Sequence, residues 1–140
     1  MTQMRVREAA MFLGVSEDTI RRRIERGALT AHTDAAGRKV LEGIEVARLA
    51  RELAVTPELP GATSTSARNR FVGLVTHVVT DTVMAQVEMQ CGPFRVVSLM
   101  SSEAARELGL EPGKVASAVV KATQVVIEAE PEHDRAGDGA

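Results

Sequence analysis

The spacing of apolar residues predicts a helical start to the chain. In residues 4–13 the apolar positions recur at helical spacing, and Gly14 ends the run. A second helix is predicted to begin after Ser16, a favoured N-cap residue that precedes two acidic residues suited to the helix dipole. It ends near Gly27, which can take the left-handed conformation found just beyond helices. Two short helices joined by a glycine-containing turn indicate a helix-turn-helix.

A shorter period follows this helix pair. Between residues 29 and 41, apolar and polar positions alternate on either side of a turn at residues 34–37, which predicts a β-hairpin. Residues 43–53 return to apolar positions at i, i+3, i+4 and i+7 and predict a third helix. Residues 1–54 are therefore predicted to form a winged helix-turn-helix domain of three helices and a hairpin.

The pattern changes again in the middle of the chain. Residues 55–65 contain two prolines, one glycine and four serine or threonine residues without a usable period, so they are predicted to be a linker. Short strands with one inserted helix then fill residues 66–128, which predicts a small β-barrel of the oligonucleotide/oligosaccharide-binding (OB) type. The predicted fold class is α+β. Residues 129–140 are acidic and rich in glycine and alanine, and predict a disordered tail.

The strand pattern of this second domain has four parts. A short helix capped by Ser101 is predicted before the last strand, and the strands are expected at residues 71–79, 83–89, 94–100 and 115–127.

Composition narrows the setting of the protein. The chain has 140 residues, 44% hydrophobic and only 2% aromatic, so its cores must be built from aliphatic side chains. A lone cysteine, the lack of any apolar run near the roughly 20 residues of a membrane span, and the charged N-terminus predict a cytoplasmic protein without a membrane segment. Histidine is sparse and no nucleophile stands beside a base, so we expect neither an enzyme nor a divalent-metal site.

Local charge points to nucleic acid, although the formal net charge of the chain is −2. Residues 1–54 contain ten Arg or Lys residues against eight Asp or Glu residues, and four of the arginines lie on the predicted second helix. In a helix-turn-helix that helix enters the major groove, and the hairpin grips a neighbouring phosphate. The alternative is a solvated face balanced by Glu17, Asp18 and Glu25. The candidate contacts to double-stranded DNA are Ser16, Thr19, Arg21, Arg22, Arg23, Arg38 and Lys39, with Arg26 on the same helix.

The second domain offers hydrogen-bond donors for a small oxyanion. A tetrahedral dianion needs several such donors and one or two cations, and the bonds from arginine and lysine are the strong ones. Taken alone these residues are ordinary, because surface cations and capping serines are common in any domain. The candidate donors are Ser66, Arg68, Asn69, Ser101, Ser102, Lys121 and Thr123.

Residues 4–54 resemble the MerR/excisionase-like winged helix-turn-helix family. The resemblance is carried by residues 7–10, residues 13–16, the run Thr19-Ile20-Arg21-Arg22-Arg23-Ile24, Gly27 and the return Gly37-Arg38-Lys39-Val40. It implies binding to duplex DNA. The long dimerisation helix of the MerR regulators has no counterpart here, so a dimer must form elsewhere.

Residues 66–128 resemble the Mop domain (molybdenum–pterin-binding, or TOBE). The resemblance is carried by Ser66-Ala67-Arg68-Asn69, Phe71-x-Gly73-x-Val75, the segment from Ser101 to Gly113 and Val120-Lys121-Ala122-Thr123. It implies a small barrel that binds molybdate or tungstate at interfaces between copies. Ser66, Ala67 and Arg68 would contact the anion from one copy, Lys121, Ala122 and Thr123 would close the site, and Ser101 or Ser102 would lie near it. The fifth position of the motif, commonly glutamine, is Arg70 here.

Together the two resemblances imply a molybdate- or tungstate-responsive, DNA-binding transcriptional regulator. Because one copy supplies only part of an interface site, the resemblance also implies a homo-oligomer, either a dimer or a larger assembly. The alternative function is an intracellular molybdate storage or buffer oligomer without a regulatory role.

Overall fold

The computed structural model describes residues 2–57 and 64–130, so most of the predicted tail at residues 129–140 and the middle of the linker lie outside the described residues. The chain divides into two compact units, residues 1–55 (unit 1) and residues 56–140 (unit 2). Among the described helices, none has the length and apolar character needed to cross a membrane.

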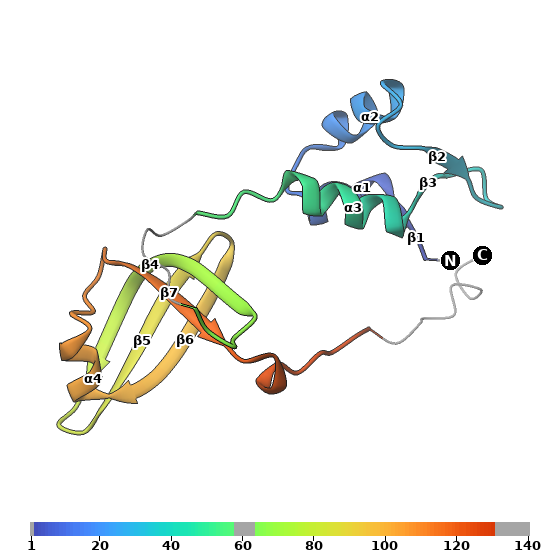
Figure 1. Cartoon of the computed structure of the whole chain (residues 1–140). Coiled ribbons are helices and arrows are strands. Elements are labelled where there is room, and N and C mark those ends of the chain that lie inside the picture. The colour runs from blue at the N-terminus through green and yellow to red at the C-terminus, as the bar shows by residue number, and fades with distance from the viewer. Residues whose placement is uncertain (1, 58–63, 131–140) are drawn as a thin grey trace. The chain divides into compact units, whose positions relative to one another are not determined.

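Unit 1 packs helices onto a small antiparallel sheet (Figure 1). The sheet has the order β1-β3-β2, and its core-facing residues meet the buried faces of the helices around Ile20 and Leu41, both fully buried. The elements are β1 (Gln3–Arg5), α1 (Val6–Leu13), α2 (Glu17–Glu25), β2 (Ala31–Thr33), β3 (Lys39–Glu42) and α3 (Gly43–Leu53).

The first predicted helix is too long at its N-terminal end. Residues 3–5 form β1, and helix α1 begins at Val6. In β1, Met4 lies opposite Leu41 of β3 and packs against the core, and the carbonyl oxygen of Thr2 accepts a bond of 2.8 Å from the Gly43 amide. Local spacing could not reveal this strand, because its partner lies more than thirty residues further along the chain.

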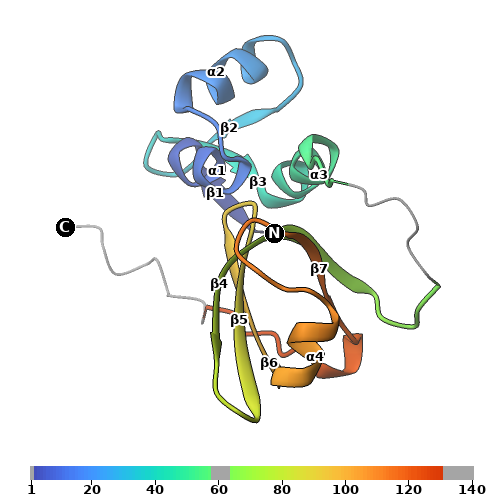
Figure 2. The ribbon, with the colours of Figure 1, turned by 90° about the vertical axis from the view of Figure 1, so that its left-hand side faces the viewer.

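Unit 2 is a curled sheet with the strand order β6-β5-β4-β7, antiparallel throughout (Figure 1). Strands β4, β5 and β6 follow one another as hairpins. The chain then passes through α4, which lies against β5 and β6 at one end of the sheet, and returns to pair β7 with β4 (Figure 2). The elements are β4 (Asn69–Thr80), β5 (Met84–Cys91), β6 (Phe94–Ser101), α4 (Ser102–Glu107), β7 (Val115–Val120) and the 3₁₀ turn η1 (Ala122–Gln124).

Strands β4 and β5 approach each other closely near an irregularity in their pairing. The register shifts between Val75 and His77, and just before that bulge Gly73 lies against the end of β5. A Cβ atom at Gly73 would stand 2.3 Å from the carbonyl oxygen of Gln90 and 2.7 Å from the sulfur of Cys91. Only glycine fits there, which explains a glycine inside a strand pattern.

The mixed α+β class and the curled sheet of an OB-like domain are confirmed, but one strand boundary is wrong. The last strand was predicted to run from residue 115 to residue 127, but β7 ends at Val120, because its partner β4 begins at Asn69 and offers no ladder beyond that point. In the described residues of unit 2 the sheet stays open between β6 and β7, so it is half a barrel.

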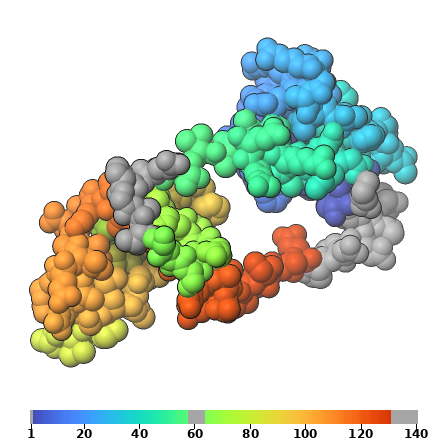
Figure 3. All heavy atoms as spheres, viewed as in Figure 1, coloured from blue at the N-terminus to red at the C-terminus, as the bar shows by residue number. Residues whose placement is uncertain are grey.

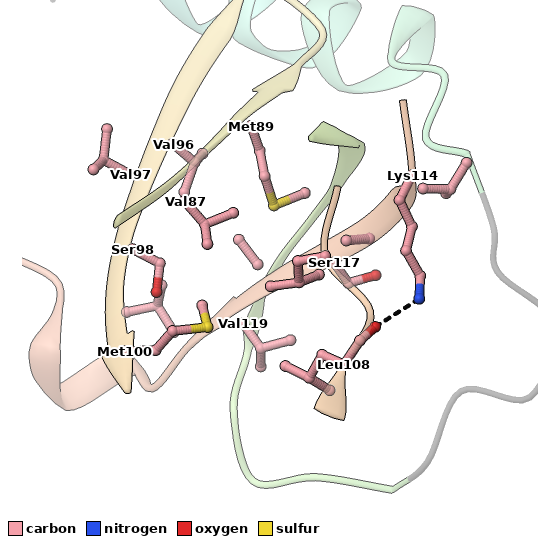
Figure 4. Close-up of a pocket in the computed structure, with 15 residues that line it drawn as sticks. Val87, Met89, Val96, Val97, Ser98, Met100, Leu108, Lys114, Ser117 and Val119 are labelled. Carbon is pink, nitrogen blue, oxygen red and sulfur yellow. Dashed lines mark hydrogen bonds between the residues drawn. The ribbon is translucent and has the colours of Figure 1, made fainter. Parts of the chain in front are cut away.

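The open side of the half-barrel is an apolar groove of about 460 Å³. Side chains of β5 and β6, among them Val87, Val96 and Met100, face those of β7 across it (Figure 4). The segment after η1 leads away from the sheet (Figure 3), and none of its described residues lines the groove. Its residues Val126 and Ile127 are 84% and 83% exposed. An unfilled groove and an exposed apolar segment therefore occur in the same unit.

Candidate functional sites

Charge on helix α2 is divided between two flanks. Thr19, Arg22, Arg23 and Arg26 follow one another at i, i+3, i+4 and i+7, so they form one stripe, which we call the basic flank. Arg21 lies off this stripe, where its guanidinium nitrogens stand 3.1 Å from Asp18 and 3.5 Å from Glu17. The predicted face thus contains Arg22 and Arg26, both exposed, whereas Arg21 is paired with acids of its own helix.

The two hydroxyls at the start of α2 stabilise the helix end. The Ser16 hydroxyl accepts a bond of 3.2 Å from the Thr19 amide and lies 2.9 Å from the Thr19 hydroxyl. The predicted N-cap is thereby confirmed. Arg23 is half-buried, and its Nε atom is buried without a hydrogen-bond partner in the described residues. Arg23 therefore belongs to the inner edge of the basic flank, next to the core residue Ile20.

The hairpin between β2 and β3 presents its cations differently. The Asp34 carboxylate accepts bonds from the amides of Ala36 and Arg38, both 2.9 Å, and one of 3.0 Å from the Arg38 side chain. Asp34 therefore orders the turn and holds the Arg38 guanidinium close to it. Lys39, the first residue of β3, is exposed.

In unit 2, strand pairing unites two of the predicted oxyanion segments. Strands β4 and β7 are antiparallel, and their ladder ends at the pair Asn69–Val120. Arg68 and Lys121 both come next beyond this pair, so the two cations lie at the same end of the sheet in a single copy. A single copy therefore brings together the two segments that the resemblance would place at an interface between copies. Ser66, Ala67, Ala122 and Thr123 belong to the same two arms.

Each arm is held by a hydrogen bond of its own. The Asn69 side-chain amide donates a hydrogen bond of 3.2 Å to the carbonyl oxygen of Val120, the residue directly before Lys121. On the other arm, the Arg68 Nη1 donates a hydrogen bond of 3.2 Å to the carbonyl oxygen of Thr65. The Thr65 hydroxyl in turn accepts a bond from the Ala67 amide. Sequence reasoning missed Thr65, although a hydroxyl residue two positions before an amide is a known turn pattern.

Ser101 and Ser102 do not join this cluster. Ser101 pairs with Met84, so it lies where β4 ends at Thr80, roughly 35 Å of strand length from Asn69. Its hydroxyl caps α4 by accepting from the Ala104 amide at 3.1 Å. Ser102 is 2% exposed, and its hydroxyl donates 3.1 Å to the Thr82 carbonyl oxygen. Within one copy both serines have structural roles away from Arg68 and Lys121.

The cluster at the Asn69 end has the chemistry of an anion site. Arg68, Ser66, Lys121 and Thr123 are exposed and supply two permanent or nearly permanent cations and two hydroxyls. Among the described residues, no group of three or more His, Cys, Asp or Glu side chains is placed to hold a metal ion. An anion is thus the ligand that suits these donors.

Residues 65–127 match the family model of the TOBE domain. A probable molybdenum-pterin-binding protein of Haemophilus influenzae is 41% identical over 66 residues, which cover 46% of this chain and 96% of that protein. The chain belongs to the TOBE-domain family.

Two solved structures are also similar to the TOBE part of the chain. A molybdate-binding protein from Sporomusa ovata is 30% identical, with a TM-score of 0.46, and covers 48% of this chain and 100% of its own. MopII from Clostridium pasteurianum is 37% identical, with a TM-score of 0.44, and covers 47% of this chain and 100% of its own. The matched TOBE region, residues 65–127, lies within unit 2 and contains both arms of the cluster.

Proposed function

We propose that this chain is a molybdate- or tungstate-responsive, DNA-binding transcriptional regulator. Unit 1 would act as a winged helix-turn-helix that binds duplex DNA, and the TOBE domain would bind the oxyanion. Anion binding would change how copies sit together, and the chain between the units would pass this change to the DNA-binding surfaces.

Family membership supports the anion half of the proposal. A TOBE relative is named for binding molybdenum-pterin, and another is named as a molybdate-binding protein. The arms that contain Arg68 and Lys121 supply charge-assisted donors at one end of the β4–β7 ladder. Ser66 and Thr123 add neutral hydroxyl donors.

The observation that carries the DNA half is the one-sided charge of α2. The half-buried Thr19 and the exposed Arg22 and Arg26 form a polar stripe along the nine-residue helix α2 and its C-cap, which follow a short helix and a glycine turn. Such a helix places its outer face in the major groove, where arginine reaches phosphates and guanine edges. The hairpin that contains Arg38 and Lys39 would lie against the neighbouring backbone.

We further propose that the protein acts as a homo-oligomer. The open edges of β6 and β7, the unfilled apolar groove and the exposed Val126 and Ile127 all support association of TOBE domains. Association would also pair two copies of unit 1, as two DNA half-sites require. Ser101 and Ser102 could approach an anion only from a second copy, since they lie at the far end of the sheet in their own.

A storage or buffer oligomer is the second candidate function. It shares the anion site but gives unit 1 no role on DNA. The basic flank of α2 favours the regulator, since a buffer has no need of an exposed arginine stripe. The acidic partners of Arg21 show that unit 1 can neutralise an arginine within its own helix.

Binding to the promoter of its own gene, measured over a range of salt concentrations, tests the regulator. Replacing Arg22 and Arg26 by alanine should weaken binding at least tenfold and lower the salt slope by about 2 per copy. Arg21→Ala, compared with Arg22→Ala alone, is the matched control, because each removes one positive charge and the two come from opposite flanks of the helix. Unchanged affinity in the double variant would leave the buffer as the better explanation.

Calorimetric titration with molybdate, tungstate and sulfate tests the anion site. Arg68→Ala and Lys121→Ala should each weaken molybdate or tungstate binding by about ten- to a hundredfold, because each removes a charge-assisted donor. Arg106→Ala, which removes an exposed arginine of α4 at the other end of the sheet, should leave the affinity unchanged. Equal affinity for sulfate, or no heat with any oxyanion, would contradict the proposal.

A further inference from the structure

Asn69 occupies a special place in the candidate anion site. It is the first residue of β4, half-buried, and pairs with Val120 as the last step of the β4–β7 ladder. Its side-chain amide donates a hydrogen bond of 3.2 Å to the carbonyl oxygen of Val120, which lies 51 residues further along the sequence. The neighbours of this pair, Arg68 and Lys121, are the two cations of the site.

We propose that Asn69 is a positioning residue for oxyanion binding, which acts by fixing the arm that contains Lys121. This inference rests on the proposed anion function of the TOBE domain and assigns Asn69 a role other than contact with the anion. Beyond Val120 the segment is held to itself and not to the sheet, because β7 has ended and the exposed 3₁₀ turn η1 is closed by the Gln124 amide, which donates a bond of 2.9 Å to the Lys121 carbonyl oxygen. The Asn69–Val120 bond is thus the last side-chain tie before the lysine.

The arm that contains Arg68 does not depend on this tie. The Arg68 guanidinium donates to the Thr65 carbonyl oxygen, which orients it. The backbone turn before Arg68 is held by the Thr65 hydroxyl, which accepts from the Ala67 amide. Loss of the Asn69 amide should therefore act on Lys121 and leave Arg68 in place. A direct ligand would behave otherwise, since its loss would add to the loss of either cation.

A double-mutant cycle read by anion titration tests the assignment. Asn69→Ala alone should weaken molybdate or tungstate binding by about five- to tenfold, because loosening the lysine forfeits part of a charge-assisted bond. In the Lys121→Ala background the same change should cost less than about twofold. In the Arg68→Ala background it should again cost its full five- to tenfold.

Thr76→Val is the matched control for stability. Thr76 also bonds through its side chain to a carbonyl oxygen of the neighbouring strand, that of Glu88 at 3.3 Å, but it lies far from the Asn69 end of β4. Both variants should lower the melting temperature by similar small amounts, and only Asn69→Ala should lower anion affinity.

Each other outcome overturns the inference in a recognisable way. An equal cost of Asn69→Ala in the Lys121→Ala background would make Asn69 a direct ligand. Loss of thermal stability without loss of affinity would leave it a purely structural residue. Wild-type protein that binds no oxyanion would overturn the proposed function together with this inference, and that result appears before any variant is made.

Discussion

The two units gather their candidate residues in opposite ways. In unit 1, all of them lie within residues 16–39, on one helix with its caps and on the hairpin that follows it. In unit 2, Arg68 and Lys121 are 53 positions apart in the numbering and meet only because β7 returns to pair with β4. A local surface follows from helical spacing, whereas a cluster formed by strand pairing requires the topology of the whole sheet.

Density of charge differs between the units as well. Helix α2 and its C-cap have four arginines, yet one of them, Arg21, is paired with Glu17 and Asp18, and another, Arg23, is half-buried. The anion cluster has only two cations, but strand pairing places both at one end of the sheet. Counting charges along the chain therefore overestimates how many free cations α2 presents and gives no sign that Arg68 and Lys121 lie at one end of the sheet.

What the sequence allowed us to predict follows the same division. The N-cap at Ser16, the hairpin turn with Gly37 and helix α3 at residues 43–53 all follow from local rules, and the structure confirms them. Strand β1, the end of β7 at Val120 and the open sheet depend on partners distant in sequence. The cap at Ser101 was also predicted from local rules and is confirmed, whereas the bond from the Ser102 hydroxyl to the distant Thr82 carbonyl oxygen was missed.

The largest expected effect separates the folding of the two units. Gly73→Ala should destabilise unit 2 by about 3 kcal/mol or more, because the new Cβ would meet backbone atoms of β5 that cannot move aside. Gly43→Ala in unit 1 is the counterpart. There the Cβ would stand 3.1 Å from the Thr2 carbonyl oxygen, near the chain end, so its cost should be small.

Hydrogen exchange read by mass spectrometry suits this pair of variants, because the chain contains no tryptophan or tyrosine. Gly73→Ala should raise exchange in β4 and β5 and leave α1 to α3 unchanged. Loss of protection in both units at once would show that they fold together, and the comparison between two separate sites would then fail.

A smaller effect should distinguish a structural serine from a candidate ligand. Ser102→Ala should lower the stability of unit 2 by about 1.5 kcal/mol, because it removes a nearly buried hydroxyl that bonds to Thr82. Anion affinity should change little. Ser66→Ala is the matched variant, and it should do the reverse, with weaker anion binding and nearly unchanged thermal stability. A loss of affinity in Ser102→Ala protein at full stability would return Ser102 to the site.

The two helix caps allow a like-for-like test across the units. Ser16 and Ser101 each accept a bond from the amide three residues on, at 3.2 and 3.1 Å. Replacement by alanine should cost about 1 kcal/mol in either case, each within its own unit. Aspartate, which also caps helices, should restore most of the loss. If Ser16→Asp fails to restore stability, the hydrogen bond between the Ser16 and Thr19 hydroxyls contributes more to the stability of unit 1 than the bond to the Thr19 amide.

The smallest expected effect is a change in pH dependence confined to unit 2. The Asp81 carboxylate accepts bonds of 2.7 Å from the Met84 and Val83 amides in the β4–β5 turn, and these bonds lower its pKa below the ordinary value. A carboxyl whose folded pKa is lowered adds stability above its unfolded pKa, and this stability is lost as pH falls through the folded pKa. Chemical unfolding followed by far-UV circular dichroism should therefore show the free energy of unfolding of unit 2 falling from about pH 5 downward, and Asp81→Asn should make this fall with pH less steep.

Part of the pH dependence should remain in that variant, because Arg95 also holds the pKa of Glu88 below its usual value. Glu111→Gln controls for the loss of one negative charge elsewhere in the unit. If that variant reduced the pH dependence of stability as much as Asp81→Asn does, the bonds in the β4–β5 turn would not be its cause.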